Sequence, residues 1–106
     1  MHNIWIVDDD EAIRLVLEES LSSAGFGTKS FSSANDLLKN LDKEQPDLII
    51  TDVQMPGMLG YDLLKHINNN YADIPVIVMT AFADMQAAVE SFGGGAFEYI
   101  PKPFDL

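Results

Sequence analysis

Short runs of apolar and β-branched residues, separated by segments of helical periodicity, constrain the fold of this chain more than any other feature. The three strongest runs are Ile4–Val7, Leu48–Thr51 and Val76–Met79. Hardly any polar residue interrupts them, which is typical of strands buried on both faces in a parallel sheet covered by helices. Two weaker strands are predicted over Thr28–Phe31 and Glu98–Ile100, near the edges of that sheet.

Helical patterns lie between these strands. The first helix is predicted over Glu11–Ala24, and Gly25 is a natural stop. Its inward face is expected to carry four apolar residues, Ile13, Val16, Leu17 and Leu21. Three further helices are expected, between Ser33 and Pro46, over Tyr61–Asn69 and over Asp84–Phe92. Alternating strands and helices with short connections predict an α/β fold, a doubly wound five-stranded parallel sheet in a three-layer sandwich.

Length and charge narrow the class of protein. A chain of 106 residues fits one domain, and the absence of cysteine excludes disulfides and thiol chemistry. The balance of 17 acidic against 6 basic residues gives a net charge of −11, which argues against direct contact with nucleic acid. No long apolar stretch indicates a membrane span, and nothing at the N-terminus reads as a signal peptide. We therefore expect a small acidic cytoplasmic domain.

The alternation of elements calls for one more helix after the last strand, but the sequence stops at Leu106. We therefore expect the chain to be a domain, residues 1–106, that lacks its final helix and belongs to a longer protein.

Polar groups follow the predicted strands. In chain order, the strand ends carry Asp8–Asp10, Asp52, Thr80 and Lys102. In an open parallel sheet the functional site lies at the carboxyl ends of the strands. Folding is therefore expected to gather several carboxylates, one hydroxyl and one ammonium group at a single edge.

This set of groups has a defined chemistry. Clustered carboxylates repel one another unless a cation lies between them. Oxygen ligands with an open coordination sphere suit a hard divalent ion such as Mg²⁺. A lysine beside that ion suits phosphoryl transfer, in which a carboxylate can itself be the nucleophile.

Four motifs carry a resemblance to a known family. They are IVDDD at 6–10, ITDVQMPGMLG at 50–60, VIVMTA at 76–81 and YIPKPF at 99–104. In this order and spacing they resemble the receiver domains of bacterial two-component response regulators, which have a CheY-like, flavodoxin-like fold. The segment GAFEYIPKPFDL at 95–106 looks most similar to the NtrC-like regulators of nitrogen metabolism. In those proteins the receiver precedes a sigma-54-dependent AAA+ ATPase and a DNA-binding domain.

The resemblance implies roles for the acidic residues. Asp52 is then the phosphoacceptor, and Asp8 and Asp9 are the acidic pair that holds Mg²⁺. Gln54 is expected to offer its backbone carbonyl to the same ion. Asp10 is then an additional acid outside the ligand set.

The resemblance also implies a switch and its partners. Lys102 is expected to contact the phosphoryl oxygens, Thr80 to turn its hydroxyl toward them and Tyr99 to move inward behind it. The donor would be the phosphohistidine of a sensor histidine kinase, and the ATPase and DNA-binding domains would form the output. A second copy of the chain is another candidate partner. Family dimers commonly use the final helix, which this sequence is expected to lack.

Two other functions are left open. A small Mg²⁺-dependent phosphohydrolase would use Asp8-x-Asp10, although Ala12 stands where that family has Thr or Val. A phosphorylation-independent interaction domain would have lost the acceptor, the lysine or the acidic pair, all of which this sequence retains. On the receiver interpretation the domain is not an enzyme in the ordinary sense, since it catalyses only its own phosphotransfer and slow autodephosphorylation.

Overall fold

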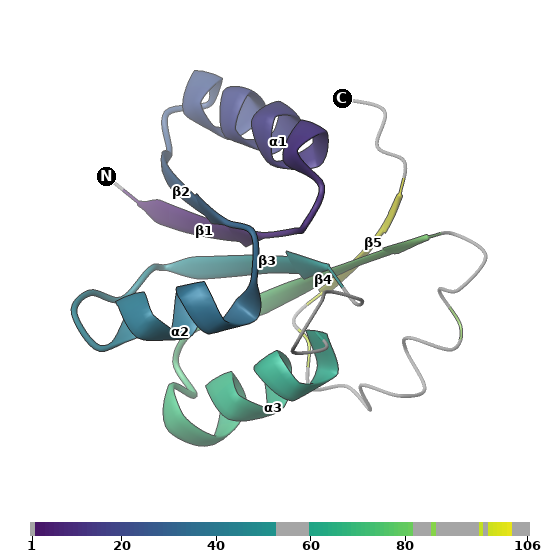
Figure 1. Ribbon diagram of the computed structural model, residues 1–106. Coiled ribbons are helices and arrows are strands. Elements are labelled where there is room, and N and C mark those ends of the chain that lie inside the picture. The colour runs from purple at the N-terminus through teal and green to yellow at the C-terminus, as the bar shows by residue number, and fades with distance from the viewer. Residues whose placement is uncertain (1, 53–59, 82–85, 87–95, 97, 103–106) are drawn as a thin grey trace.

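The fold is built on one parallel sheet (Figure 1). The computed structural model describes residues 2–52, 60–81, 86, 96 and 98–102. Five strands lie in the spatial order β2-β1-β3-β4-β5, and every neighbouring pair is parallel. They are β1 (Asn3–Val7), β2 (Gly27–Phe31), β3 (Leu48–Asp52), β4 (Val76–Ala81) and β5 (Glu98–Lys102). The predicted doubly wound sheet is confirmed, and the two weaker strands, β2 and β5, are its edges.

Three helices are described, α1 (Glu11–Ser23), α2 (Ala34–Leu41) and α3 (Gly60–Asn70). Their boundaries follow local chemistry. Ser33 caps α2, because its hydroxyl accepts a hydrogen bond from the Asp36 N–H at 3.2 Å. Gly25 follows α1 with a φ of 96°, a left-handed conformation that costs glycine little. The helix predicted over Asp84–Phe92 lies outside the described residues, except for residue 86.

The order of the strands decides which face each helix covers. The chain moves from β1 to β2 in one direction and then from β2 through β3 to β4 in the other. Right-handed crossovers therefore place α1 on one face of the sheet and α2 and α3 on the opposite face, as Figure 1 shows. The chain reverses direction between the neighbouring strands β1 and β3. In folds of this kind, ligands bind at the carboxyl ends of the two strands where the reversal occurs.

Two apolar cores follow from these layers. The larger one lies beneath α2 and α3 and includes Trp5, Leu37, Ile49, Ile67 and Val78. The smaller one lies beneath α1 and consists of Ile4, Ile6, Leu17, Ile50 and Met79, with partly buried side chains around it. Both cores anchor β1 and β3, and so they hold the ends of these two strands in place.

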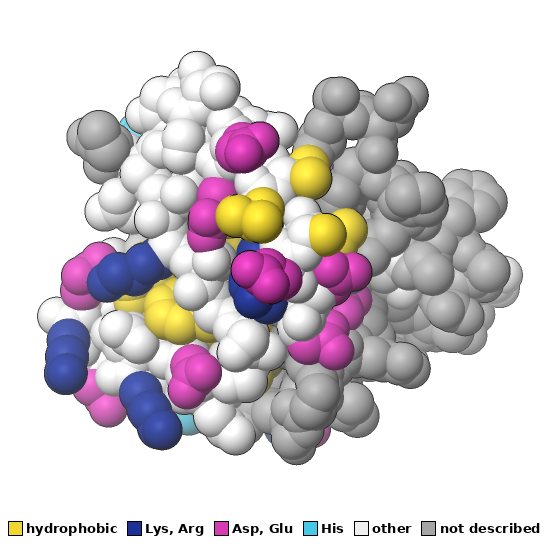
Figure 2. Space-filling model, turned by 45° about the horizontal axis from the view of Figure 1, so that its top comes forward, with side chains coloured by type: hydrophobic (Ala, Val, Ile, Leu, Met, Phe, Trp, Pro, Cys, Tyr) yellow, Lys and Arg dark blue, Asp and Glu magenta, His cyan; other side chains and the backbone are white. Residues whose placement is uncertain are grey.

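Helix α1 corrects one detail of the sequence analysis. Val16 was expected to face the core, but 42% of its surface is exposed, and Leu15 is 51% exposed. Successive residues are turned by about 100° around a helix, so Val16 lies on the flank when Leu17 faces the sheet. Figure 2 shows apolar side chains among acidic ones on the face that carries α1.

In the described part of the chain, no helix is long and apolar enough to cross a membrane.

Candidate functional site

The loop after β1 carries the first acidic residues of the site, and Asp8 is its most constrained member. Asp8 is fully buried. Its N–H donates to the Phe31 carbonyl at 3.2 Å, and its Oδ1 accepts from the Asp10 N–H at 2.9 Å. Its own carbonyl accepts a hydrogen bond from Arg14 Nη1 at 2.5 Å. These contacts hold both the main chain and the carboxylate of Asp8.

Asp10 has a separate, structural role. It is the N-cap of α1, and its Oδ1 accepts from the Ala12 N–H at 2.9 Å. A carboxylate at this position also complements the positive end of the helix dipole. Asp10 therefore uses its side chain to begin α1, which agrees with its expected place outside the ligand set.

The carboxylates of Asp8, Asp9 and Asp52 meet at the carboxyl edge of the sheet. One ligand oxygen from each lies within 4.8 Å of the others. Asp8 is buried, Asp52 is partly buried at the end of β3, and Asp9 is exposed. The cluster forms at the point where the chain reverses direction across the sheet, so residues about 44 positions apart in sequence lie together.

This donor set fits a hard divalent cation. All three donors are carboxylate oxygens, which Mg²⁺ prefers, and opposite ligands of an octahedral Mg²⁺ lie about 4.2 Å apart. The oxygens of Asp8, Asp9 and Asp52 are therefore close to the spacing that one ion requires. Asp9 is exposed, so solvent reaches this member of the cluster. Gln54, the fourth predicted ligand, lies outside the described residues.

The other predicted residues lie on β4 and β5. Asp52 pairs with Met79 in the β3–β4 register, so the buried Thr80 is one residue further toward the same edge. Lys102 is the last residue of β5 and pairs with Ala81, next to Thr80. The backbone therefore brings the strand positions of Thr80 and Lys102 to the edge that holds Asp52. The side chain of Lys102 is outside the described part of the structure.

Tyr99 lies on β5, away from the acidic cluster. It pairs with Val78 and packs against the core beneath α2 and α3, with its hydroxyl oxygen shielded from solvent. The structure thus places this residue behind the carboxyl edge and not within the acidic cluster.

Two further residues, Arg14 and Thr51, make contacts at the site that the sequence did not predict. Arg14 donates to the carbonyl of Asp8, and the buried Thr51 hydroxyl donates to the carbonyl of Asp52 at 3.1 Å. Each therefore holds the main chain of an acidic residue. The sequence signals were a basic residue one turn into the helix and a hydroxyl within an otherwise apolar strand.

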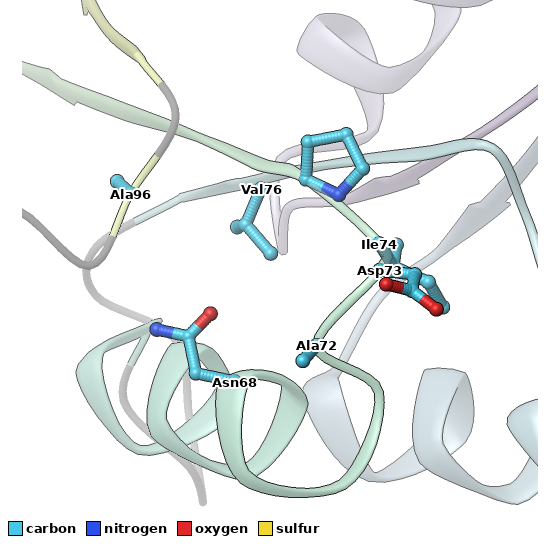
Figure 3. Close-up of a pocket in the computed structure, with 7 residues that line it drawn as sticks. Asn68, Ala72, Asp73, Ile74, Val76 and Ala96 are labelled. Atoms are coloured by element: carbon cyan, nitrogen blue, oxygen red, sulfur yellow. The ribbon is translucent and has the colours of Figure 1, made fainter.

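A cleft of about 380 Å³ lies elsewhere, between the end of α3 and the start of β4 (Figure 3). Asn68 and Val76 point into it, and Asp73 lies at its side. Because β4 begins at Val76, this cleft is at the amino edge of the sheet, opposite the acidic cluster.

The fold and the acidic edge together define a receiver domain of the two-component signalling class. The chain belongs to the response regulator receiver domain family, which matches residues 4–106. The NtrC-like resemblance is also confirmed. The chain is 50% identical, over 98% of its length, to the DNA-binding transcriptional regulator NtrC of Proteus hauseri. It is 46% identical, over 97% of its length, to NtrC of Escherichia coli K12, and it spans 22% of the length of each of these relatives.

Solved structures show the same fold. The response regulator TrrA of Thermotoga maritima, in complex with Mg²⁺-BeF, matches with a TM-score of 0.87 and 30% identity. The match covers 99% of this chain and 90% of TrrA. The chain is therefore a signalling domain of two-component systems, and the phosphohydrolase alternative is not favoured.

Proposed function

We propose that Asp52 accepts a phosphoryl group from the phosphohistidine of a sensor histidine kinase. An oxygen of the Asp52 carboxylate attacks phosphorus, the bond from phosphorus to the histidine nitrogen breaks, and the nitrogen recovers a proton. The product is an acyl phosphate on Asp52. The chain would catalyse only this transfer and the slow hydrolysis of the acyl phosphate.

The observation that carries this proposal is the meeting of three carboxylates at 4.8 Å or less. Asp8, Asp9 and Asp52 would hold Mg²⁺, together with the backbone carbonyl of Gln54. When bound, the ion would neutralise the negative charge of the acids and of the phosphoryl oxygens. The Mg²⁺-BeF complex of TrrA supports the choice of ion, because that relative has the same fold.

The proposed switch uses β4 and β5. Phosphorylation adds roughly two negative charges at one point. We assign the Lys102 ammonium and the Thr80 hydroxyl to pair with these negative charges, since both residues lie at the carboxyl edge of the sheet, as Asp52 does. Tyr99 would then move inward, into space that the Thr80 side chain leaves. Two packings of this region are biased by one charge change, as in other phosphorylation switches.

The proposed output lies outside this chain. Residues 1–106 would form the receiver of a longer regulator, which would also contain an AAA+ ATPase and a DNA-binding domain. The receiver would control sigma-54-dependent transcription in nitrogen regulation, and a second copy of the protein would be a partner in assembly. We assign the protein to the cytoplasm, where the kinase domain and DNA are available. The net charge of −11 supports a receiver that does not itself contact DNA.

The use of Asp10 speaks against the phosphohydrolase alternative. That reaction would need Asp8 and Asp10 as a pair, but the Asp10 carboxylate accepts a hydrogen bond from the Ala12 N–H and caps α1. An interaction domain without phosphorylation has no use for three repelling carboxylates at one point.

Intact-protein mass measures the proposed chemistry directly. The chain is incubated with acetyl phosphate, with and without Mg²⁺, and compared with Asp52→Asn. We expect the mass of one phosphoryl group, present only with both Mg²⁺ and Asp52. The matched control is Asp73→Asn, which removes an exposed acid at the opposite edge and should leave the adduct unchanged. An adduct that persists in Asp52→Asn would disprove the assignment of the acceptor.

A further inference from the structure

We propose that Arg14 is a positioning residue for the metal-binding loop. It fixes the main chain of Asp8, so that the Asp8 carboxylate meets those of Asp9 and Asp52. This inference rests on the proposed Mg²⁺ site and adds a residue to its machinery.

Arg14 contacts the loop at two points. Its Nη1 donates to the carbonyl oxygen of Asp8 at 2.5 Å, and its backbone N–H donates to the carbonyl oxygen of Asp10 at 3.2 Å. The second bond is the first helical hydrogen bond of α1, and the first bond reaches back to the end of β1. Arg14 thus joins the two ends of the segment Asp8–Asp10 and sets its shape.

The remaining contacts of this segment show why such a tie matters. Asp8 is fully buried and is also held by the Phe31 carbonyl and by the Asp10 N–H. Those partners are main-chain groups, which remain when a side chain is exchanged for any residue other than proline. Arg14 contributes a side-chain contact to Asp8, and it can be changed without altering any acid of the cluster. Partners that orient metal ligands are worth about 10–100-fold in metal affinity.

Because Arg14 is positively charged, the direction in which its removal changes Mg²⁺ affinity tests the inference. A guanidinium group near the site repels a second cation, so an arginine that acted only as a charge would weaken Mg²⁺ binding. An arginine that holds the ligands in place would strengthen it. Removing Arg14 therefore has opposite effects under the two roles.

The test is calorimetric titration of the whole chain with Mg²⁺ alone, in the parent and in Arg14→Met. Methionine keeps the helix propensity and the apolar stem of arginine but offers no donor. We expect the Kd for Mg²⁺ to rise about tenfold. The matched control is Lys39→Met, which removes one exposed positive charge on α2 and should leave the Kd almost unchanged. An equal or lower Kd in Arg14→Met overturns the inference.

The rate of phosphorylation by acetyl phosphate gives a second readout. A positioning role predicts a higher half-saturating Mg²⁺ concentration in Arg14→Met and nearly the parent rate at saturating Mg²⁺. A lower maximal rate with unchanged half-saturation would contradict it. Arg14→Lys keeps the charge and one donor nitrogen, so its Kd should lie between those of the parent and Arg14→Met.

Circular dichroism shows whether each variant is folded. If Arg14→Met does not fold, Arg14→Lys decides, because it keeps the positive charge but not the donor geometry of the guanidinium group: a raised Kd supports the role and an unchanged Kd contradicts it. The proposed function fails separately, if the parent itself neither binds Mg²⁺ nor takes up a phosphoryl group. A parent that does both, with an Arg14→Met variant that binds equally well, overturns only the role of Arg14.

Discussion

At the amino edge of the sheet, the Asp47 carboxylate links two neighbouring strands through a main-chain hydrogen bond, whereas at the carboxyl edge three carboxylates face one another. Asp47 Oδ2 accepts from the Asn3 N–H at 2.7 Å and lies 3.7 Å from His2 Nδ1. The Asp47 N–H in turn donates to the Asn3 carbonyl at 2.8 Å. At the other edge, one carboxylate oxygen each of Asp8, Asp9 and Asp52 lies within 4.8 Å of the other two.

The difference separates a structural aspartate from the three for which we propose a function. Asp47 joins the starts of β1 and β3, because its carboxylate accepts a hydrogen bond from the Asn3 N–H. The acids at the carboxyl edge repel one another, and this repulsion opposes folding unless a cation joins them. A cluster that opposes the fold is expected where function requires it. Substitutions of acids at one edge can therefore be compared with substitutions of acids at the other edge.

The largest expected effect is stabilisation by Mg²⁺. At a free concentration one hundred times its Kd, the ion should raise the free energy of unfolding by about 2.7 kcal/mol. Asp8→Asn should lose most of this gain, because the variant lacks a buried charged ligand, while Asp47→Asn should keep it. Urea unfolding followed by fluorescence of Trp5, the single tryptophan, measures both variants. NaCl of equal ionic strength separates binding from screening. An equal gain in Asp8→Asn would contradict the assigned site.

Neutralising one acid should stabilise the chain in the absence of Mg²⁺. We expect Asp52→Asn to raise the free energy of unfolding by roughly 1 kcal/mol, because it removes like-charge repulsion from a partly buried cluster. Most substitutions destabilise, so the sign is informative. The gain should shrink with added salt, and Asp73→Asn at the opposite edge should change little. A less stable Asp52→Asn in metal-free buffer would show that the cluster is not strained.

The layers of the fold could be predicted because they depend on periodicity. Continuous apolar runs mark β1, β3 and β4, and the capping serine at Ser33 marks the start of α2. The exposure of Val16 could not be predicted, because an apolar residue on the flank of α1 fits the same spacing as one that faces the sheet. That distinction depends on where the sheet lies, which is a tertiary property.

The acidic cluster was predictable for a different reason. Parallel strands bring their carboxyl ends to one edge, so residues after β1 and at the end of β3 had to meet. The contacts of Arg14 and Thr51 with main-chain carbonyls depend on side-chain torsions and were not predictable from spacing. The roles of all the predicted site residues stay predictions: Asp8, Asp9, Asp52, Gln54, Thr80, Tyr99 and Lys102.

The smallest effect is expected at the amino edge. Asp47→Ala removes the acceptor of the Asn3 N–H, and we expect the free energy of unfolding to fall by roughly 0.5 kcal/mol, because Asp47 is exposed and water can replace it. His2→Gln should change stability less, since the His2–Asp47 pair at 3.7 Å is also exposed. Neither substitution should alter the phosphoryl adduct or the Kd for Mg²⁺. Loss of the adduct in Asp47→Ala would mean that the two edges are coupled through β1 and β3, and that the acid at the amino edge is not purely structural.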